Sequence, residues 1–413
     1  MSYFRINIYL QIKHFISSIF LVEPEVSSKI TKIINKFTNK KYTVLTSQLR
    51  VGFYLLLKYL KQEFPQKNEI IISSYNLAEM INIPRNLKLK IVFAKSNENI
   101  FMFEKDLKKK INKKTLAVVT TNIFNSYEDI SKIKKICLKK EIPLIEDNAL
   151  YFGNFHKKKN KKIYAGSIGD YSLNSFNIMK NISAMYGGSV SSNNNKFIVY
   201  AKKEISEYKQ FSLIKYAKQC FIFILLKLLS LKFFYRILFF DLIKYAHSVN
   251  NKFILKFVYP SLNFRKKNIS NDYHTKISSL SLKMILLQLK DIGNIMQNHK
   301  TRKDNNIYFN KKFKQKRIKG LKLVSLKDPD FQNFNDFPII VNDKKLLLNF
   351  LFKKGIETKA IQYLDCSKIF LSKNNKKEIL DNFEDKILCL PNHKKISKKY
   401  IDYIINCISS FQK

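Results

Sequence analysis

A chain of 413 residues with 46% hydrophobic and 14% aromatic residues can hold a sizeable core, or a large and a small domain, and is not disordered. Its formal net charge of +45 suggests nucleic acid or an anionic membrane as a partner, but only seven of its 76 basic residues are arginine. Because phosphate and base recognition favour arginine, we expect no dedicated nucleic-acid binding, although the positive charge should attract anionic metabolites and acidic membrane surfaces.

The cysteines and histidines form no metal-binding pattern. The five cysteines contain no CxxC pair and the six histidines are dispersed, which argues against a zinc site and for a reducing compartment. Residues 1–22 include a short apolar stretch, HFISSIFLV, but no small-residue cleavage site follows it, so we predict no signal peptide. We therefore expect a cytoplasmic protein that holds no metal.

Between about residues 43 and 190, short apolar runs alternate with longer helical patterns. Thr46 and Ser47 precede VGFYLLLKYL, which predicts a capped and buried helix. The remaining pattern predicts a helix at 128–140 and strands at 69–73, 90–95, 116–122, 142–147 and 171–176. The segment 116–147 is then a strand–helix–strand unit, which implies parallel strands and an α/β fold.

A very apolar segment spans about residues 205–260, but lysines and one arginine interrupt it, and no charge-free run is long enough to span a membrane. On a single helix, most of its basic residues would fall on one side: Lys215, Lys218, Lys232, Arg236 and Lys244. Lys227 would be the exception. A basic stripe on an apolar helix is typical of a membrane surface. Packing on the protein's own core or across a dimer interface is the alternative, and the sequence leaves both open.

A smaller unit begins near residue 300. A strand is predicted at 337–341, helices at 344–356 and 396–411, and a surface loop rich in Lys and Asn at 370–378. We predict a large domain over residues 1–260, which includes the apolar segment, and a small C-terminal domain over residues 261–413.

The residues that could carry chemistry follow two of the predicted strands. Asp147 ends one strand, and open α/β sheets bind ligands at the carboxyl ends of their strands. Lys180 follows the next strand and stands near Gly187 and Gly188. A partly desolvated lysine can lose its proton and attack a carbonyl, and a carboxylate can keep a pyridine nitrogen protonated. With 69 lysines in the chain, spacing alone does not distinguish Lys180 from a solvated surface residue.

Four short motifs occur in one order along the chain: LIEDNA, GSIGD, SFNIMKN and YGG. In this order they resemble the DegT/DnrJ/StrS family of sugar aminotransferases, which are pyridoxal 5′-phosphate enzymes of the aspartate aminotransferase fold (fold type I). The upstream segments TSQLRVGFYLLLKYL and ISSYN, and the downstream segments LLQLKDI, KKGIETKAIQY and CLPNHKKISKKYIDYIINCI, are also similar to that family. The resemblance implies a large domain with a mostly parallel mixed sheet and a smaller C-terminal α/β domain.

The resemblance also implies roles in the chemistry. Lys180 would bond to the cofactor and later move a proton between the substrate carbon and the cofactor carbon. Asp147 would pair with the pyridine nitrogen of the cofactor.

Five further residues would hold the cofactor by the same resemblance. Ser175 would donate its hydroxyl to the cofactor phosphate, and the backbone amides of Leu49 and Arg50 would complete the phosphate site. Tyr75 would stack on the cofactor ring, with an ordinary core tyrosine as the alternative. Asn177 would lie near the phosphate and the substrate.

Three departures from the family pattern concern this region. Gln48-Leu49-Arg50 stands where the family usually has glycine, and Leu150 replaces a polar residue near the ring. His274-Thr275-Lys276 stands in place of the N-Y-R segment, whose asparagine enters the neighbouring subunit's site. We still expect this chain to bind the cofactor. The changes concern which amino donor and which acceptor it uses.

The function implied by the resemblance is transfer of an amino group, with glutamate as the expected donor, to a keto sugar nucleotide for surface polysaccharide or amino-sugar biosynthesis. A homodimer is implied too, because family active sites borrow residues across the interface. One alternative is a dehydratase on the same fold, but such relatives replace the lysine with histidine, so Lys180 speaks against it. The other is a non-catalytic form that binds a partner or a membrane surface, with membrane contact through about residues 205–245.

Overall fold

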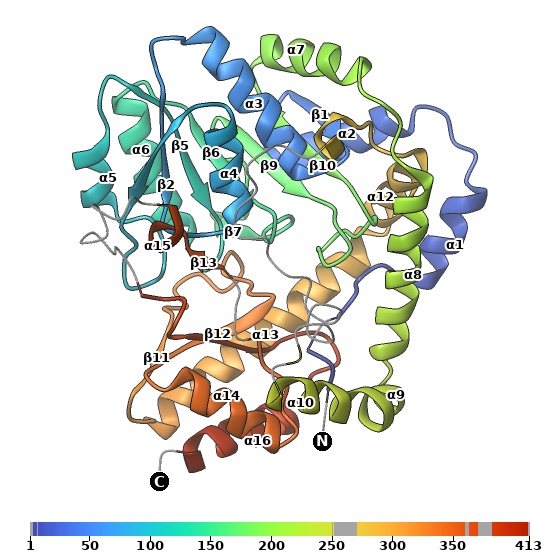
Figure 1. Cartoon of the computed structure of the whole chain (residues 1–413), viewed down its shortest axis with the longest axis vertical. Coiled ribbons are helices and arrows are strands. Elements are labelled where there is room, and N and C mark those ends of the chain that lie inside the picture. The colour runs from blue at the N-terminus through green and yellow to red at the C-terminus, as the bar shows by residue number, and fades with distance from the viewer. Residues whose placement is uncertain are drawn as a thin grey trace.

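The computed structural model describes residues 3–5, 7–249, 251, 271–359, 363–370 and 382–411. The chain forms a large α/β unit around a seven-stranded sheet and a smaller unit around a three-stranded sheet (Figure 1). The predicted α/β class is confirmed. Of the predicted surface loop at 370–378, all but Phe370 lies outside the described residues. Within the described ranges, no helix combines the length and apolar character needed to cross a membrane.

The large sheet has the strand order β1-β10-β9-β6-β5-β2-β4. Its strands are β1 (Tyr42–Thr46), β2 (Glu69–Ser73), β4 (Lys90–Ala94), β5 (Thr115–Thr121), β6 (Leu144–Asp147), β9 (Tyr171–Ser175) and β10 (Gly188–Ser192). From β9 to β4 all strands are parallel, whereas β10 runs antiparallel to its neighbours β9 and β1. The sheet is therefore mixed but mostly parallel, as predicted.

Helices cover both faces of this sheet, so alternate side chains of its strands enter two apolar layers. Ile70 and Ile72 of β2 pack in one layer with α3 (Leu49–Glu63), α4 (Ala78–Asn86) and α7 (Asn195–Ser206). Ile71 packs in the other layer with α5 (Glu104–Lys110) and α6 (Tyr127–Lys139). The continuous apolar run EIIIS follows from burial of β2 on both faces.

The predicted helix after Thr46 and Ser47 is confirmed, but its predicted cap is wrong. The N-cap position of α3 belongs to Gln48, whose side chain makes no capping bond. Its Oε1 instead accepts a hydrogen bond from Arg50 Nη2 at 2.6 Å, and the hydroxyl of Thr46 donates to the Gln48 carbonyl at 2.8 Å. The side chain of Gln48 therefore does not cap the first amides of α3.

The apolar segment after α7 is broken into short helices, so the predicted single helix with one basic stripe is wrong. α8 (Leu213–Leu229) ends at Ser230, and α9 (Lys232–Phe234), η1 (Tyr235–Phe239) and α10 (Phe240–Ser248) follow in a different direction (Figure 1). The break allows Tyr235 and Phe240 to become buried, with the ring of Phe240 stacked 6.4 Å from that of Phe352 in the small unit. Residue 250 and residues 252–270 lie outside the described ranges.

The small unit has a three-stranded sheet packed against helices. Its elements are α13 (Ile292–Lys316), β11 (Leu321–Leu323), β12 (Asp336–Val341), α14 (Lys344–Lys353), β14 (Ile387–Pro391) and α16 (Lys398–Phe411). The predicted strand at 337–341 and the two predicted helices are confirmed. The first of these helices ends at Lys353, just before Gly355, which has a φ of +79°.

Contacts between the units do not follow sequence order. The ring of Tyr3 lies 4.5 Å from that of Tyr400 in the small unit, whereas α12 (Ser279–Lys290) packs on α1 (Ile12–Phe20) and α2 (Val26–Thr38) of the large unit. A short ladder of β3 (Tyr75–Asn76) with β13 (Leu364–Asp365), which leads into α15 (Cys366–Phe370), joins the units directly. The division predicted at residue 260 stays a prediction.

Candidate functional site

The carboxyl ends of two neighbouring strands bring the main candidate residues together. Asp147 is the last residue of β6 and pairs with Leu173 of β9, and Ser175 is the last residue of β9. Lys180 lies in the turn that leads from β9 to β10, close enough to Asp147 for their charges to interact. The structure thus places Lys180 beside Asp147 at an edge where α/β sheets bind ligands.

The local sequence around Lys180 forms a tight turn. The side-chain Oδ1 of Asn177 accepts the Ile178 amide at 2.6 Å, and the backbone carbonyl of Asn177 accepts the Lys180 amide at 2.9 Å. The hydroxyl of Ser183 donates to the Ile178 carbonyl at 2.6 Å and fixes the other side of the turn. Asn177 therefore holds the backbone that presents Lys180, and the contact predicted for it with a phosphate stays a prediction.

Burial shifts the pKa values of both Lys180 and Asp147 toward their uncharged forms. Burial lowers the pKa of the Lys180 amine to about 8, while the nearby charge of Asp147 opposes that shift and Lys359 adds to it. Burial also raises the pKa of Asp147, against the hydrogen bond that its Oδ1 accepts from the Ala149 amide at 3.0 Å and against the charge of Lys180. With this pKa, about a tenth of Lys180 is an uncharged nucleophile at pH 7, far more than for an ordinary lysine.

The start of α3 lies against the same end of the sheet. In the ladder of β1, β10 and β9, Gly188 pairs with both Thr46 and Ser175. A Cβ on Gly188 would stand 2.3 Å from the Leu49 amide nitrogen, so only glycine permits this close approach. The Ser175 residue and the first amides of α3 thus share one corner, as a helix N-terminal anion site requires.

The side chain of Arg50 is bonded to neighbouring side chains, among them Gln48. Its Nη1 donates to Glu79 Oε1 at 2.9 Å, and the hydroxyl of Tyr273 donates to the other oxygen of Glu79 at 3.0 Å. Only the backbone amide of Arg50 is left for the role predicted for it.

Tyr75 is buried where the two units meet. Its ring lies 5.8 Å from that of Tyr363 and 6.2 Å from that of Phe383, and burial raises its pKa well above the usual value. These contacts fit the core-tyrosine alternative, and stacking of Tyr75 on a cofactor stays a prediction.

Two residues of the small unit approach the site and were not predicted. Lys359 acts on the pKa of Lys180, and its Nζ lies 3.2 Å from Asp336 Oδ2. Tyr363 is buried, and the charge of Asp147 contributes to the rise of its pKa. Both belong to the segment KKGIETKAIQY, so resemblance located the segment but no spacing rule connects it with Lys180.

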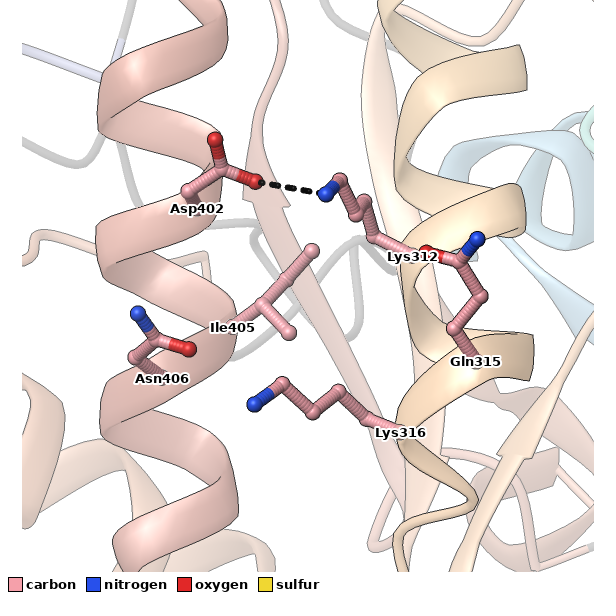
Figure 2. A pocket seen from close by; sticks show the side chains of 6 residues that line it. All are labelled: Lys312, Gln315, Lys316, Asp402, Ile405 and Asn406. Atoms are coloured by element: carbon pink, nitrogen blue, oxygen red, sulfur yellow. Dashed lines mark ion pairs between the residues drawn. The ribbon is translucent and has the colours of Figure 1, made fainter.

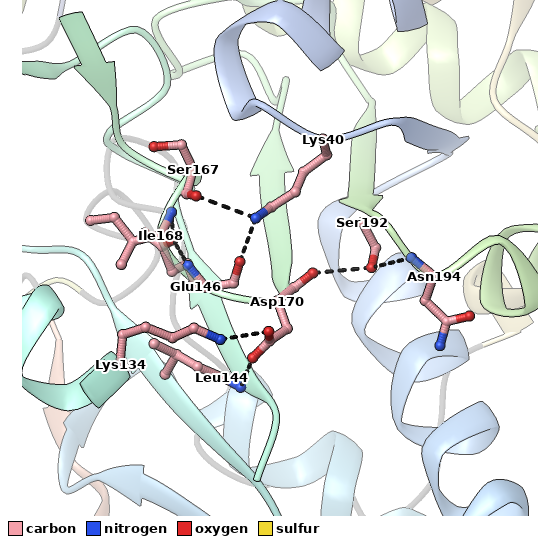
Figure 3. A network of polar contacts seen from close by, with 10 residues as sticks. Lys40, Lys134, Leu144, Glu146, Ser167, Ile168, Asp170, Ser192 and Asn194 are labelled. Carbon is pink, nitrogen blue, oxygen red and sulfur yellow. Dashed lines mark hydrogen bonds and ion pairs between the residues drawn. The ribbon is translucent and has the colours of Figure 1, made fainter. Parts of the chain in front are cut away.

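The motifs LIEDNA and GSIGD interlock through Glu146, which precedes Asp147 (Figure 3). Its Oε2 accepts the Gly166 amide at 3.1 Å and its Oε1 accepts the Ile168 amide at 2.9 Å. Lys40 Nζ donates to the Gly169 carbonyl at 2.6 Å, and Asp170 accepts the Leu144 amide at 2.8 Å. This network fixes the turn before β9 and so the register of Asp147 with β9.

The structure also places the other positions at which this chain departs from the family pattern. Leu150 is partly buried against two apolar clusters, one of which extends into the small unit. The hydroxyl of Thr275 donates to that of Ser47 at 3.2 Å, and the Lys276 amide donates to the Lys209 carbonyl at 2.8 Å. The segment 274–276 therefore borders the start of α3 in the same chain.

A groove of about 580 Å³ lies between α13 and α16 of the small unit (Figure 2). It is lined by Lys312, Gln315, Lys316, Asp402, Ile405 and Asn406. None of the candidate residues lines this groove, so it is separate from the site around Lys180.

Comparison with known proteins places the sequence in a family. The model of the DegT/DnrJ/EryC1/StrS aminotransferase family matches residues 12–217. GDP-perosamine synthase of Vibrio cholerae is 30% identical over 164 residues, which cover 40% of this chain and 43% of that protein. GDP-perosamine synthase of Escherichia coli O157:H7 is 29% identical over 175 residues, which cover 41% and 46%. The matches thus span less than half the length of these curated relatives.

Solved structures show the fold over the whole chain. Helicobacter pylori PseC, an aminotransferase involved in the biosynthesis of pseudoaminic acid, superposes with a TM-score of 0.73 at 16% identity, over 100% of this chain and 99% of that one. The PLP-form of the putative sugar aminotransferase Spr1654 from Streptococcus pneumoniae gives 0.70 at 13% identity, over 100% and 98%. At these identities the likeness establishes the fold and no more.

Proposed function

We propose that this chain, which belongs to the DegT/DnrJ/EryC1/StrS aminotransferase family, binds pyridoxal 5′-phosphate and transfers an amino group from an amino acid to a keto sugar linked to a nucleotide. The observation that carries the proposal is Lys180, a half-buried lysine whose desolvated amine has a pKa of about 8, beside Asp147 at the ends of β6 and β9. Glutamate is the proposed donor. The proposed product is an amino sugar for surface polysaccharide or related biosynthesis.

The residues at this site fit the cofactor. The corner formed by Ser175, Gly188 and the first amides of α3 suits a phosphate, since Gly188 leaves no Cβ between β10 and the Leu49 amide. When bound, pyridoxal phosphate supplies a ring that accepts electrons from the carbon that loses its proton. Lys180 would hold the cofactor and carry that proton, and the Asp147 carboxylate would keep a proton on the pyridine nitrogen.

Lys180→Ala tests the assignment. Wild-type protein purified with excess pyridoxal phosphate should be yellow and lose that absorbance when glutamate is added. The variant should lose at least about 100-fold in amino transfer, the lower end of what a general acid–base group contributes. Lys196→Ala, on the exposed surface of α7, is the matched control and should behave like wild type.

Two outcomes would contradict the proposal. If Lys180→Ala turns over like wild type, the lysine is wrongly assigned. If wild-type protein binds no cofactor even when pyridoxal phosphate is in excess, this chain is a non-catalytic form of the fold that binds a partner or a membrane surface.

The cellular setting is part of the same proposal. We propose a cytoplasmic homodimer, by analogy with the family and because all five cysteines are free thiols, as a reducing compartment requires. We also propose a peripheral membrane contact through about residues 205–245, which does not depend on amino transfer.

A further inference from the structure

Helix α1 buries polar side chains and turns several large apolar side chains outward. His14 and Ser18 are buried, and His14 Nε2 lies 3.2 Å from Asp291 Oδ2, whereas Ile16 is 49% and Phe20 75% exposed. A surface helix surrounded by water normally turns its apolar side to the core. The outward side of α1 is therefore suited to an apolar environment.

Helix α8 lies beside α1 (Figure 1), and the rings of Phe15 and Phe223 are 5.2 Å apart. Four of its exposed residues are spaced by seven, three and four positions, so they form one stripe along the helix: Ile214, Phe221, Ile224 and Leu228. Phe223, Leu226 and Leu229 lie on the opposite side and are buried.

The exposed apolar side chains of these helices and of those that follow form what we call the outer face. Its residues are Ile12, Ile16, Ile19 and Phe20 of α1, Leu213, Ile214, Phe221, Ile224 and Leu228 of α8, Phe233 of α9, Ile237 of η1, and Leu242 and Tyr245 of α10. Exposed apolar surface on this scale marks an interaction site.

The charge around the outer face is mostly positive. No acidic residue occurs between Glu207 and Asp241, a stretch that contains six basic residues, and none occurs in residues 1–22. Lys215, Lys218 and Arg236 are exposed beside the apolar side chains, whereas Lys13 on α1 lies 3.4 Å from Asp291. Asp241 on α10 is an exposed carboxylate at this face. A second copy of the chain would bring the same cations to this surface, whereas an anionic bilayer offers both opposite charge and an apolar interior.

We propose that the outer face docks on anionic lipid bilayers, with α1 and α8 lying in the membrane interface. α8 has 17 residues and carries Lys215, Lys218 and Lys227, so it is too short and too charged to span, but it suits a position parallel to the surface. This docking is independent of amino transfer, and it would hold the site of Lys180 near lipid-bound or membrane-bound partners.

Vesicle flotation of the full-length protein tests the docking. Wild type should float with vesicles that contain phosphatidylglycerol and much less with vesicles of phosphatidylcholine alone. Phe221→Ser combined with Ile224→Ser should lower the partition coefficient by about tenfold or more, because two large side chains no longer enter the bilayer. Leu138→Ser combined with Leu346→Ser, at exposed positions on α6 and α14, is the matched control and should leave flotation unchanged.

Circular dichroism and amino-transfer activity of each variant show that it is folded, which separates failed docking from a failed function. The proposal is overturned if wild type does not float with anionic vesicles at low salt. Equal flotation of the Phe221/Ile224 variant and the control would attribute binding to net charge alone and would also overturn it. So would sedimentation that shows a dimer which the Phe221/Ile224 variant no longer forms, because a second copy would then cover the face.

Discussion

Lys180 and Lys227 show what distinguishes a reactive lysine from one whose amine is only desolvated. Burial lowers the pKa of both amines to about 8. Lys227 donates to the Ile8 carbonyl at 2.8 Å and lies near Lys394 and Lys395, with no carboxylate among the causes of its shift. Lys180 instead faces Asp147 at the strand ends. A lowered pKa alone therefore does not identify the site, whereas the pairing with Asp147 does.

The pKa of Lys180 predicts how cofactor capture depends on pH. Only the uncharged amine attacks the aldehyde, so the rate of pyridoxal phosphate uptake by apoprotein should rise about tenfold per pH unit below 8 and level off above it. An absorbance stopped-flow series measures this rate. A rate that still rises steeply at pH 10 would show that Lys180 titrates like an ordinary surface lysine.

The same shift has a consequence for stability. The folded pKa lies below the unfolded value of 10.5, so between about pH 8 and 10.5 the unfolded chain binds more protons than the folded one. Lys180 therefore lowers the free energy of unfolding below pH 8, and this destabilisation is lost as the pH rises from about 8 to 10.5.

At the level of elements, hydrophobic pattern predicted the central strands but not β1 and β10. β2 and β5 contain apolar runs and β6 ends the segment IPLIED, whereas β10 reads GSVSS and is nonetheless fully buried. Its polar side chains pair with each other across strands: Thr43 with Ser191 at 2.7 Å and Asn174 with Ser189 at 3.2 Å. Such pairing depends on tertiary neighbours and leaves no periodic signal in the sequence.

The residues of the candidate site also divide into those that the local sequence predicts and those that depend on tertiary packing. Asp147, Ser175 and Lys180 lie within one stretch of chain and could be predicted from motif order. Lys359 and Tyr363 reach the site only because the small unit packs against the large one, and no local rule anticipates that packing. The cap of α3 was mispredicted because Gln48, not Ser47, takes the N-cap position.

Gly188→Ala tests the contact between β10 and α3. The added Cβ would stand 2.3 Å from the Leu49 nitrogen, so the helix start must shift. We expect a loss of about 1–3 kcal/mol in the free energy of unfolding and weaker binding of pyridoxal phosphate, measured by denaturant titration and by absorbance.

Gly293→Ala is the matched control for this substitution. Gly293 lies near the start of α13 with nothing within 4 Å of the position of a Cβ. Alanine there should be neutral or stabilise by up to about 1 kcal/mol, because it favours the helix. Equal effects of the two substitutions would mean that the α3 contact is unimportant.

On the scale of the whole molecule, the first residues of the chain hold the small unit in place. The Arg5 side chain lies 3.2 Å from Glu357, which is fully buried and also accepts the Tyr235 hydroxyl at 2.5 Å. His393 Nε2 lies 3.0 Å from the Phe4 carbonyl. Glu357 thus connects the N-terminal segment, η1 and the small unit.

Glu357→Ala should destabilise the protein by about 3–5 kcal/mol, since it leaves the buried Arg5 without its carboxylate. Glu128→Ala removes an exposed ion pair with Lys132 and should cost less than about 1 kcal/mol. Denaturant titration of both variants measures the difference. Similar losses would refute the view that Glu357 joins the three segments.

The pairing of β1 with β10 also sets the order in which the molecule can assemble. β1 ends at Thr46, but its neighbour β10 in the large sheet begins at Gly188, so more than 140 residues must be synthesised before β1 finds its place. The parallel strands β2, β4, β5 and β6 involve shorter separations and can pair earlier. A chain still on the ribosome without β10 would have Asp147 in place and no phosphate corner. Binding of pyridoxal phosphate would then show that the large unit is complete. Nascent chains that lack β10 would bind none and would remain colourless.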